Sequence, residues 1–336
     1  MTIYDISEKA GVSIATVSRV LNGSANVRPK TRQKVLDVIE EYGYTPNAFA
    51  RGLGLNTMSA VGIICADCSD MFLAKAVYFV ERSLRAQGYE SILCCSGYEL
   101  EGKKEAVNIL LQKRVDSIIL IGSNFIYEDN ESNNYIREAA EKVPVMLLNA
   151  DFDSPNVYCT FCDDFKAAFD STTYLIEKGS RKILHLYDSL SYAGRRKLAG
   201  YQGALLAADI PVDKNLHQLY QGNRESAQEI SDFIESIVSS GVEFDAIAAS
   251  NDYMAMGAMR YARLHHISVP EDMQIMGYNN TVLTTCSFPE LSSVDNKIEQ
   301  ITTQLVHTLV EILNGNKMPQ KTVLSAELCC RATTRE

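Results

Sequence analysis

Four cysteines form two Cys-x-x-Cys pairs, and each pair has the spacing that supplies half of a zinc site. The pairs are Cys65–Cys68 and Cys159–Cys162, and about ninety residues separate them. Because compact zinc ribbons hold their pairs far closer, the sequence favours cysteines buried as small apolar side chains over a metal or redox site. Cys94–Cys95 and Cys329–Cys330 are adjacent pairs, poorly placed to chelate one ion. No metal site is therefore predicted.

The remaining reactive side chains form no catalytic pattern. The five histidines (185, 217, 265, 266 and 307) lack the H-x-x-x-H and H-E-x-x-H spacings of metal-dependent hydrolases. The chain also lacks G-x-S-x-G, a Walker loop and G-x-G-x-x-G. The glycines of residues 50–56, ARGLGLN, follow an expected helix rather than a strand, so they do not form a dinucleotide fingerprint. We therefore predict no catalytic residue, no cofactor and no enzyme activity.

Residues 12–23, VSIATVSRVLNG, have a spacing that suits contact with DNA. Ser13 is a good N-cap, since its hydroxyl can accept a hydrogen bond from a free N–H group of the next turn. Val17, Val20 and Leu21 form an apolar stripe. The opposite face carries Ile14, Ala15, Ser18, Arg19 and Asn22.

Two further helices are expected around this segment. Ile3, Ile6 and Ala10 recur at helical spacing and stop at Gly11. Two short helices joined by a Gly-Val-Ser turn form a helix-turn-helix, in which the second helix enters the major groove of DNA. A plain three-helix bundle with a solvated face is the alternative that composition leaves open. The third helix follows Pro29, with Val35, Val38, Ile39 and Tyr42 as its expected buried side.

Charge is distributed unevenly along the chain. The formal net charge is -10, whereas residues 1–60 carry seven Lys/Arg and five Asp/Glu, a net of +2 that leaves −12 for the remainder. A mildly basic head on an acidic body is typical of a nucleic-acid-binding module attached to a body that does not bind nucleic acid. Chance is the alternative, because +2 is a small excess.

Length and composition exclude several classes of protein. With 336 residues, 46% of them hydrophobic, the chain is long enough for more than one packed domain. No run of eighteen apolar residues occurs, so no membrane span is expected. The start, MTIYDISEKAG, lacks the basic and apolar regions of a signal peptide. Nine cysteines, an odd number, suit a reducing compartment. We therefore predict a cytoplasmic protein.

After residue 60, short β-rich runs alternate with amphipathic helices that often end in glycine. This alternation predicts parallel sheets with helices on both faces, and about ten strands are enough for two such lobes. Ligands bind sheets of this kind beyond the C-terminal ends of the strands. Strands are expected within 60–66, 90–96, 116–122, 143–149, 182–188, 245–251 and 274–279.

Residues 2–53, TIYDISEKAGVSIATVSRVLNGSANVRPKTRQKVLDVIEEYGYTPNAFARGL, resemble the DNA-binding head of the LacI/GalR family of bacterial transcription regulators. The match is nearly continuous, and TIYD, SIATVSRV and PNAFARGL are most similar to the catabolite control protein A branch. The resemblance implies a helix-turn-helix domain at 1–45, a hinge helix or linker at 46–57, and an effector-binding and dimerisation domain at 58–336.

The resemblance also implies roles for residues of the head. Ile14, Ala15 and Arg19 would read bases, while most of the others would contact phosphates. Leu53 would be an apolar wedge in the minor groove, in a hinge that folds when two copies pair on a near-palindromic operator. The expected DNA-binding residues are Tyr4, Ser13, Ile14, Ala15, Thr16, Ser18, Arg19, Asn22, Asn26, Tyr44, Asn47, Ala48, Arg51 and Leu53.

In the body the resemblance is looser and reaches the end of the chain. It rests on LAGYQGAL (198–205), NDYMAMGAM (251–259), GYNN (277–280), FPELSSV (288–294) and RATTR (331–335). It implies a periplasmic-binding-protein-like fold whose chain crosses between two lobes three times. The N-lobe would hold about 60–160 and 292–320, and the C-lobe about 162–290 and 321–336.

The resemblance implies an effector cleft between the lobes, and this chain departs from the family pattern there. Arg224 stands where the family has an aromatic ring, and Asn279 where it has an aspartate. These changes favour an effector with an anionic group, such as a sugar phosphate or sugar acid. The alternative is that Arg224 faces solvent or pairs with an acid such as Glu225. The expected cleft residues are Phe72, Leu73, Asp163, Arg196, Lys197, Arg224, Asn251 and Asn279.

These observations predict a dimeric, sequence-specific DNA-binding transcriptional regulator, expected to be a repressor. A small carbohydrate-type effector between the lobes would control its affinity for the operator. One alternative keeps the head but uses a phosphorylated protein as corepressor; against it, residues 295–312 contain only one lysine. Another is a plain sugar-binding protein, which the operator-reading head and the missing signal peptide disfavour.

Overall fold

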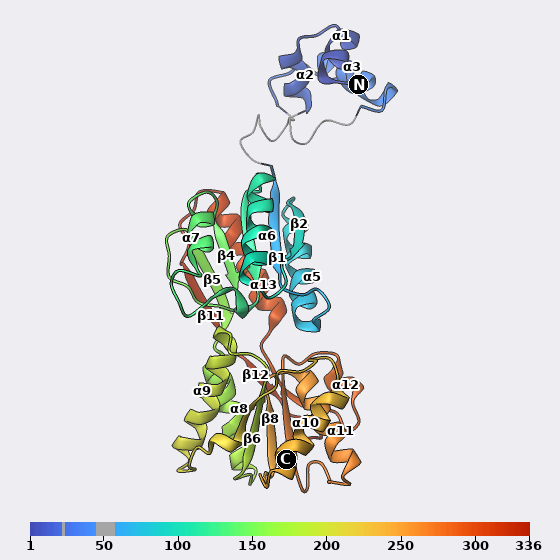
Figure 1. Cartoon of the computed structure of the whole chain (residues 1–336). Coiled ribbons are helices and arrows are strands. Elements are labelled where there is room, and N and C mark those ends of the chain that lie inside the picture. Colours follow the sequence, from blue (N-terminus) through green and yellow to red (C-terminus); the bar gives the residue numbers. More distant parts are fainter. Residues whose placement is uncertain (22–23, 45–57) are drawn as a thin grey trace.

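The computed structural model describes residues 1–21, 24–44 and 58–336. They form a small all-helical head and a body of two α/β lobes (Figure 1). Within these ranges, no helix combines the length and apolar character needed to cross a membrane. The hinge predicted at 46–57 lies outside the described residues, as do the predicted DNA contacts Asn22, Asn47, Ala48, Arg51 and Leu53.

The head contains the three predicted helices. They are α1 (Ile3–Ala10), α2 (Ile14–Leu21) and α3 (Pro29–Glu41). Gly11 ends α1 in the left-handed conformation with φ 59°, and the Ser13 hydroxyl accepts a hydrogen bond from the Thr16 amide at 3.2 Å. Their shared core is built from Ile6, Ala10, Val17, Val20, Val27 and Val35.

One predicted core residue of the head is wrong. Tyr42 is exposed, and the Lys9 ammonium lies 4.2 Å from the centroid of its ring. Tyr42 directly follows the last residue of α3, as its C-cap. Its ring lies under the Lys9 ammonium, a cation–π contact, instead of entering the core.

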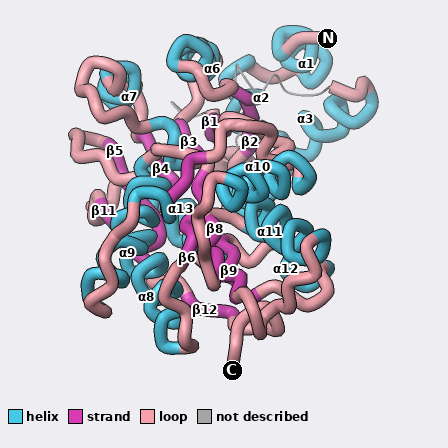
Figure 2. The backbone as a smooth tube through the Cα atoms, turned by 60° about the horizontal axis from the view of Figure 1, so that its bottom comes forward, coloured by secondary structure: helices cyan, strands magenta, loops and turns pink. Residues whose placement is uncertain are grey.

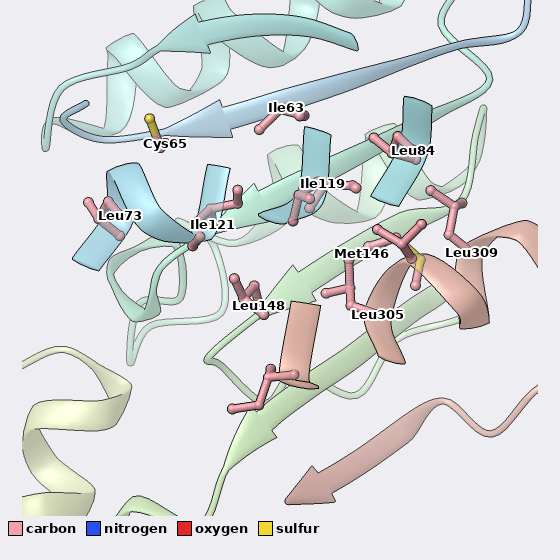
Figure 3. Close-up of a cluster of buried hydrophobic side chains, with 14 of the residues drawn as sticks. Ile63, Cys65, Leu73, Leu84, Ile119, Ile121, Met146, Leu148, Leu305 and Leu309 are labelled. Atoms are coloured by element: carbon pink, nitrogen blue, oxygen red, sulfur yellow. The ribbon is translucent and has the colours of Figure 1, made fainter. Parts of the chain in front are cut away.

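The first lobe is a six-stranded parallel sheet with strand order β11-β5-β4-β3-β1-β2. Ile63, Ile119 and Ile121 on one face pack against Leu84 and against Leu305 and Leu309 from a later segment (Figure 3). A second apolar cluster covers the other face. The elements are β1 (Ala60–Cys65), α5 (Met71–Ala86), β2 (Glu90–Cys95), α6 (Leu100–Gln112), β3 (Ser117–Ile121), α7 (Asn134–Ala140), β4 (Val145–Leu148), β5 (Val157–Cys162), α13 (Ile298–Leu313) and β11 (Lys321–Leu324).

The second lobe is another six-stranded sheet, ordered β12-β10-β9-β8-β6-β7, with only β12 antiparallel to its neighbour. Helices α8 and α9 cover one face, α10 and α11 the other, so strands lie inside and helices outside (Figure 2). The elements are α8 (Asp164–Glu177), β6 (Ile183–Tyr187), α9 (Tyr192–Ala207), β7 (His217–Leu219), α10 (Ala227–Ser239), β8 (Ala246–Ala249), α11 (Asp252–Leu264), β9 (Gln274–Tyr278), α12 (Leu283–Cys286), β10 (Ser292–Asp295) and β12 (Glu327–Cys329).

The chain crosses between the lobes three times: after β5, between β10 and α13, and between β11 and β12. Two of the predicted lobe boundaries are wrong. Residues 292–295 belong to the second lobe, because β10 pairs with β9 (Val294 with Tyr278). Residues 321–324 belong to the first, because β11 pairs with β5. Both strands are short and partly polar, so they lack the apolar run that marks the central strands.

Candidate functional site

Helix α2 and the residue before it present the expected exposed face. Ser13, Ile14, Ala15 and Arg19 are exposed, while Val17 and its neighbour Val20 fill the head core. Tyr4 on α1 and Asn26 after α2 are also exposed, whereas Thr16 and Ser18 are half-buried. Tyr44 is half-buried and packs against the head core. A helix with small side chains around one arginine can approach a groove closely.

A pocket lies between the two lobes of the body. Its volume is ≈ 140 Å³, which corresponds to roughly ten water molecules. The first lobe contributes residues that follow β1, β2, β3 and β4, and the second lobe contributes residues that follow β6, β7, β8 and β9. The walls therefore come from the carboxyl ends of both sheets, where parallel sheets bind ligands.

Six of the eight predicted cleft residues line this pocket, and two do not. Asp163 and Arg196 lie outside the wall and pair with each other, Arg196 Nη2 to Asp163 Oδ1, at 3.3 Å. The side chains of Arg196 and Lys197 leave α9 about 100° apart, so only one of the two neighbours can point inward. The residues on the wall are Phe72, Leu73, Lys197, Arg224, Asn251 and Asn279.

Asp188 is the central residue of the pocket that the sequence analysis missed. One carboxylate oxygen, Oδ2, accepts a hydrogen bond from Asn251 Nδ2 at 3.0 Å and lies 3.4 Å from Arg224 Nε. The Asp188 backbone carbonyl accepts a hydrogen bond from Arg224 Nη2 at 2.9 Å. The sequence does contain a signal for Asp188, because this acidic residue ends the predicted strand KILHLYD, directly after β6. Arg224 therefore pairs with Asp188 rather than facing solvent or pairing with Glu225.

The second cation of the pocket, Lys197, is also held by the protein. Its ammonium donates a hydrogen bond to the Ser250 carbonyl at 2.9 Å and lies 3.7 Å from the centroid of the Tyr278 ring. A second carboxylate, Asp70, caps α5 by accepting from the Leu73 amide at 2.9 Å. Burial raises the pKa of Asp70, and the nearby negative charge of Asp188 acts in the same direction. Two cations and two carboxyl groups thus share the pocket.

The remaining polar groups suit hydrogen bonding with hydroxyl groups. Asn124 Nδ2 is buried at the pocket and has no hydrogen-bond partner among the described residues. Burying a donor of this kind destabilises the folded protein unless another group accepts a hydrogen bond from it. Phe72 and Tyr98 add aromatic surface to the wall. Neither histidine nor cysteine lines the pocket, so the wall offers no nucleophile–base pair of the Ser–His or Cys–His type.

Comparison with known families identifies the two parts of the chain. Residues 2–47 match the family described as "Bacterial regulatory proteins, lacI family". Residues 58–330 match "Periplasmic binding proteins and sugar binding domain of LacI family". The chain belongs to the LacI family. The resemblance seen in the sequence is therefore confirmed, and this LacI-family protein is a DNA-binding transcriptional regulator with a sugar-binding domain.

Individual relatives agree along the whole chain. An HTH-type transcriptional regulator of Lachnoclostridium phytofermentans is 49% identical over 99% of both chains. Catabolite control protein A of Priestia megaterium is 33% identical over 94% of this chain and 93% of its own. A crystal structure of the Lac repressor dimer bound to operator and the anti-inducer ONPF superposes with a TM-score of 0.88, at 25% identity over 99% of both chains. These LacI-family relatives are regulators, not enzymes.

Proposed function

We propose that this chain is a dimeric cytoplasmic repressor that binds a near-palindromic operator and responds to an uncharged sugar or sugar derivative between its lobes. The head is residues 1–45, the hinge 46–57, and the sensing and dimerising body 58–336. The similarity to the Lac repressor dimer on its operator supports the dimer and the symmetric DNA site. The remaining support comes from the pocket and from the exposed face of α2.

The charge balance of the pocket favours an uncharged effector. Arg224 has Asp188 as its partner, and Lys197 donates to a backbone carbonyl over an aromatic ring. An anionic ligand would have to compete with Asp188 and would also meet Asp70. A sugar hydroxyl can both donate to these carboxylates and accept from Asn124 Nδ2. We therefore replace the anionic effector expected from sequence with a neutral one.

The two lobes are linked at the pocket, so a ligand there can change their relative arrangement. Ser123 in the first lobe donates a hydrogen bond to Ser191 in the second at 2.9 Å. A sugar that touches both lobes favours the arrangement in which both sets of contacts form. That preference becomes a coupling free energy between sugar binding and DNA binding. The hinge, with Leu53 as the minor-groove wedge, would transmit it to the head.

In the head, we assign base reading to Ile14, Ala15 and Arg19, which lie on the exposed part of α2. The other members of the predicted set would contact phosphates and fix the register of the helix on DNA. These are Tyr4, Ser13, Thr16, Ser18, Asn22, Asn26, Tyr44, Asn47, Ala48 and Arg51.

A thermal shift measurement on the full chain tests the effector class. Neutral sugars, sugar phosphates and sugar acids are compared, because a ligand that binds only the folded state raises the melting temperature. We expect a rise of a few degrees with a neutral sugar, reduced in Asn124→Ala and kept in the control Asn316→Ala outside the pocket. A rise only with anionic sugars would contradict the proposal. No rise with any sugar would favour a protein corepressor.

A further inference from the structure

We propose that Cys65, Cys68 and Cys95 form a binding site for one thiophilic d¹⁰ cation, Zn²⁺ or Cu⁺, beside the interlobe pocket. Cys68 Sγ lies 3.1 Å from Cys65 Sγ and 3.0 Å from Cys95 Sγ. All three sulfur atoms lie within 4.8 Å of one another. Nothing in the regulator function described above uses these three thiols.

The fold of the first lobe brings the three thiols together. Cys65 is the last residue of β1 and Cys95 the last of β2, and the two are register partners on adjacent parallel strands. Partners in register point to the same face of a sheet. Cys68 follows three residues after Cys65, in the loop that leads to α5. The sequence alone does not reveal the set, because Cys95 stands beside Cys94 in the sequence and meets Cys65 only through the register of β2 with β1.

The spacing of the sulfur atoms suits metal coordination. Zinc–thiolate bonds of about 2.3 Å in tetrahedral geometry place sulfur atoms roughly 3.8 Å apart. Two of the separations here are 3.1 and 3.0 Å and the third is no more than 4.8 Å, so shifts of about 1 Å would be enough. A disulfide would use two of the thiols and leave the third without a role. Three converging thiols therefore favour an ion over a disulfide.

The chemistry of the thiols selects the class of ion. Soft thiolate ligands select Cu⁺ and Zn²⁺ over Mg²⁺, Ca²⁺ and Mn²⁺. Free cysteine thiols carry their protons at neutral pH, because their ordinary pKa is about 8.5. Metal binding then replaces up to three S–H bonds by metal–sulfur bonds and releases the protons to solvent. No electrons are transferred, so no oxidant is needed.

An ion can reach the site from solvent. Cys65 is buried and Cys68 half-buried, but Cys95 is exposed. Three thiolate ligands complete the trigonal coordination of Cu⁺. Zn²⁺ is four-coordinate and would bind one water as well. The site also adjoins the pocket, because Asp70 and Phe72 follow Cys68 in the same loop and helix start and both line the wall. This link to effector binding rests on the proposed function; metal binding itself does not.

Direct metal binding to the reduced full chain tests the site. The chain is stripped of metal without oxygen, mixed with Zn²⁺ or Cu⁺, passed through gel filtration, and assayed for metal per chain. Co²⁺ gives an independent readout through its thiolate charge-transfer absorption. We expect one ion per chain, and an affinity at least tenfold lower in Cys68→Ser and Cys95→Ser. Cys94→Ser is the matched control, since its half-buried side chain packs on the opposite face of the sheet.

Two results would overturn the metal site. They are no metal retained by the wild-type chain, or equal affinity in Cys68→Ser and the wild-type chain. The assay contains neither DNA nor sugar, so failure of the metal site and failure of the regulator proposal are distinguishable.

Discussion

Asp188 holds Arg224 inside the pocket, with Arg224 Nε 3.4 Å from one carboxylate oxygen and its Nη2 2.9 Å from the Asp188 carbonyl. The side chain of Asp188 is largely buried, whereas that of Arg224 is more exposed. The pair therefore does two things: it cancels the positive charge at this wall, and it orients a donor toward the pocket.

Asp188→Asn tests this pairing. The substitution leaves Arg224 without its charged partner, so the pocket gains positive charge. We expect affinity for the neutral sugar to fall at least tenfold and affinity for a sugar phosphate to rise, both measured by titration calorimetry on the full chain. Asp170→Asn, at the exposed pair with Lys166, is the control and should change neither. Unchanged binding of both ligand classes would remove Asp188 from the recognition set.

Replacing two glycines of α9 by alanine should have opposite effects on stability. A Cβ on Gly200 would lie 2.2 Å from the Phe165 carbonyl oxygen on α8, whereas a Cβ on Gly203 meets only ordinary contacts of 3.4 Å or more. Gly200→Ala should therefore destabilise the body by roughly 1–3 kcal/mol through overpacking. Gly203→Ala should stabilise it by up to about 1 kcal/mol through helix propensity. Denaturant unfolding of both variants measures this, and equal effects would contradict the close packing of α8 on α9.

The stability of the second lobe should fall on acidification because of His185. Burial, and to a smaller extent the charges of Lys197 and His217, lowers the pKa of His185 from 6.5 to about 3. Its Nδ1–H donates to the Ala248 carbonyl at 2.9 Å, which opposes this shift, but burial outweighs the hydrogen bond and the folded state holds the ring neutral. Between about pH 6.5 and 3 the unfolded chain binds one more proton, and stability therefore decreases as pH falls through that window.

The expected loss from pH 7 to pH 5 is about 2 kcal/mol, and His185→Asn should remove most of it while keeping a donor to Ala248. Denaturant unfolding at several pH values, for both proteins, measures the difference. The raised pKa values of Asp164 and Asp252 act with the opposite sign and are common to both proteins. Parallel pH profiles would show that His185 does not contribute.

Arg19 should read one base position in each half-site. It is exposed on α2, and a base-reading arginine contributes roughly 1–3 kcal/mol of discrimination. Arg19→Ala should weaken binding to the selected operator by that amount and relax its preference at one position, measured by fluorescence anisotropy on matched and mutated sites. Arg85→Ala, on α5 of the body, should have no effect. Equal losses on operator and random DNA would make Arg19 a phosphate contact instead.

Sequence periodicity predicted the elements whose pattern is local. The apolar runs at β1, β3 and β8 are buried on both faces, and the caps at Ser13 and Gly11 mark helix ends by their own chemistry. Strands such as β10 and β11 escaped prediction, because their register depends on distant partners rather than on apolar content.

Only part of the pocket was predicted, because its side chains also depend on partners that are distant in the sequence. Family motifs located Phe72, Arg224 and Asn251, but the orientation of a side chain depends on its helix and its partners. Arg196 points away to Asp163, and Asp188 turns inward to Arg224. Neither outcome follows from residue type or spacing alone. The three converging thiols likewise require the register of β1 with β2.

The central claim is tested most directly by the affinity of the full chain for an operator selected from randomised DNA. This affinity is measured with and without the sugar that raises the melting temperature of the chain. The account predicts at least a fivefold change in DNA affinity on adding the sugar to the wild-type chain, and a smaller change in Asp188→Asn at the same sugar concentration. If a sugar that binds the pocket leaves DNA affinity unchanged, the pocket is not the effector site of this regulator.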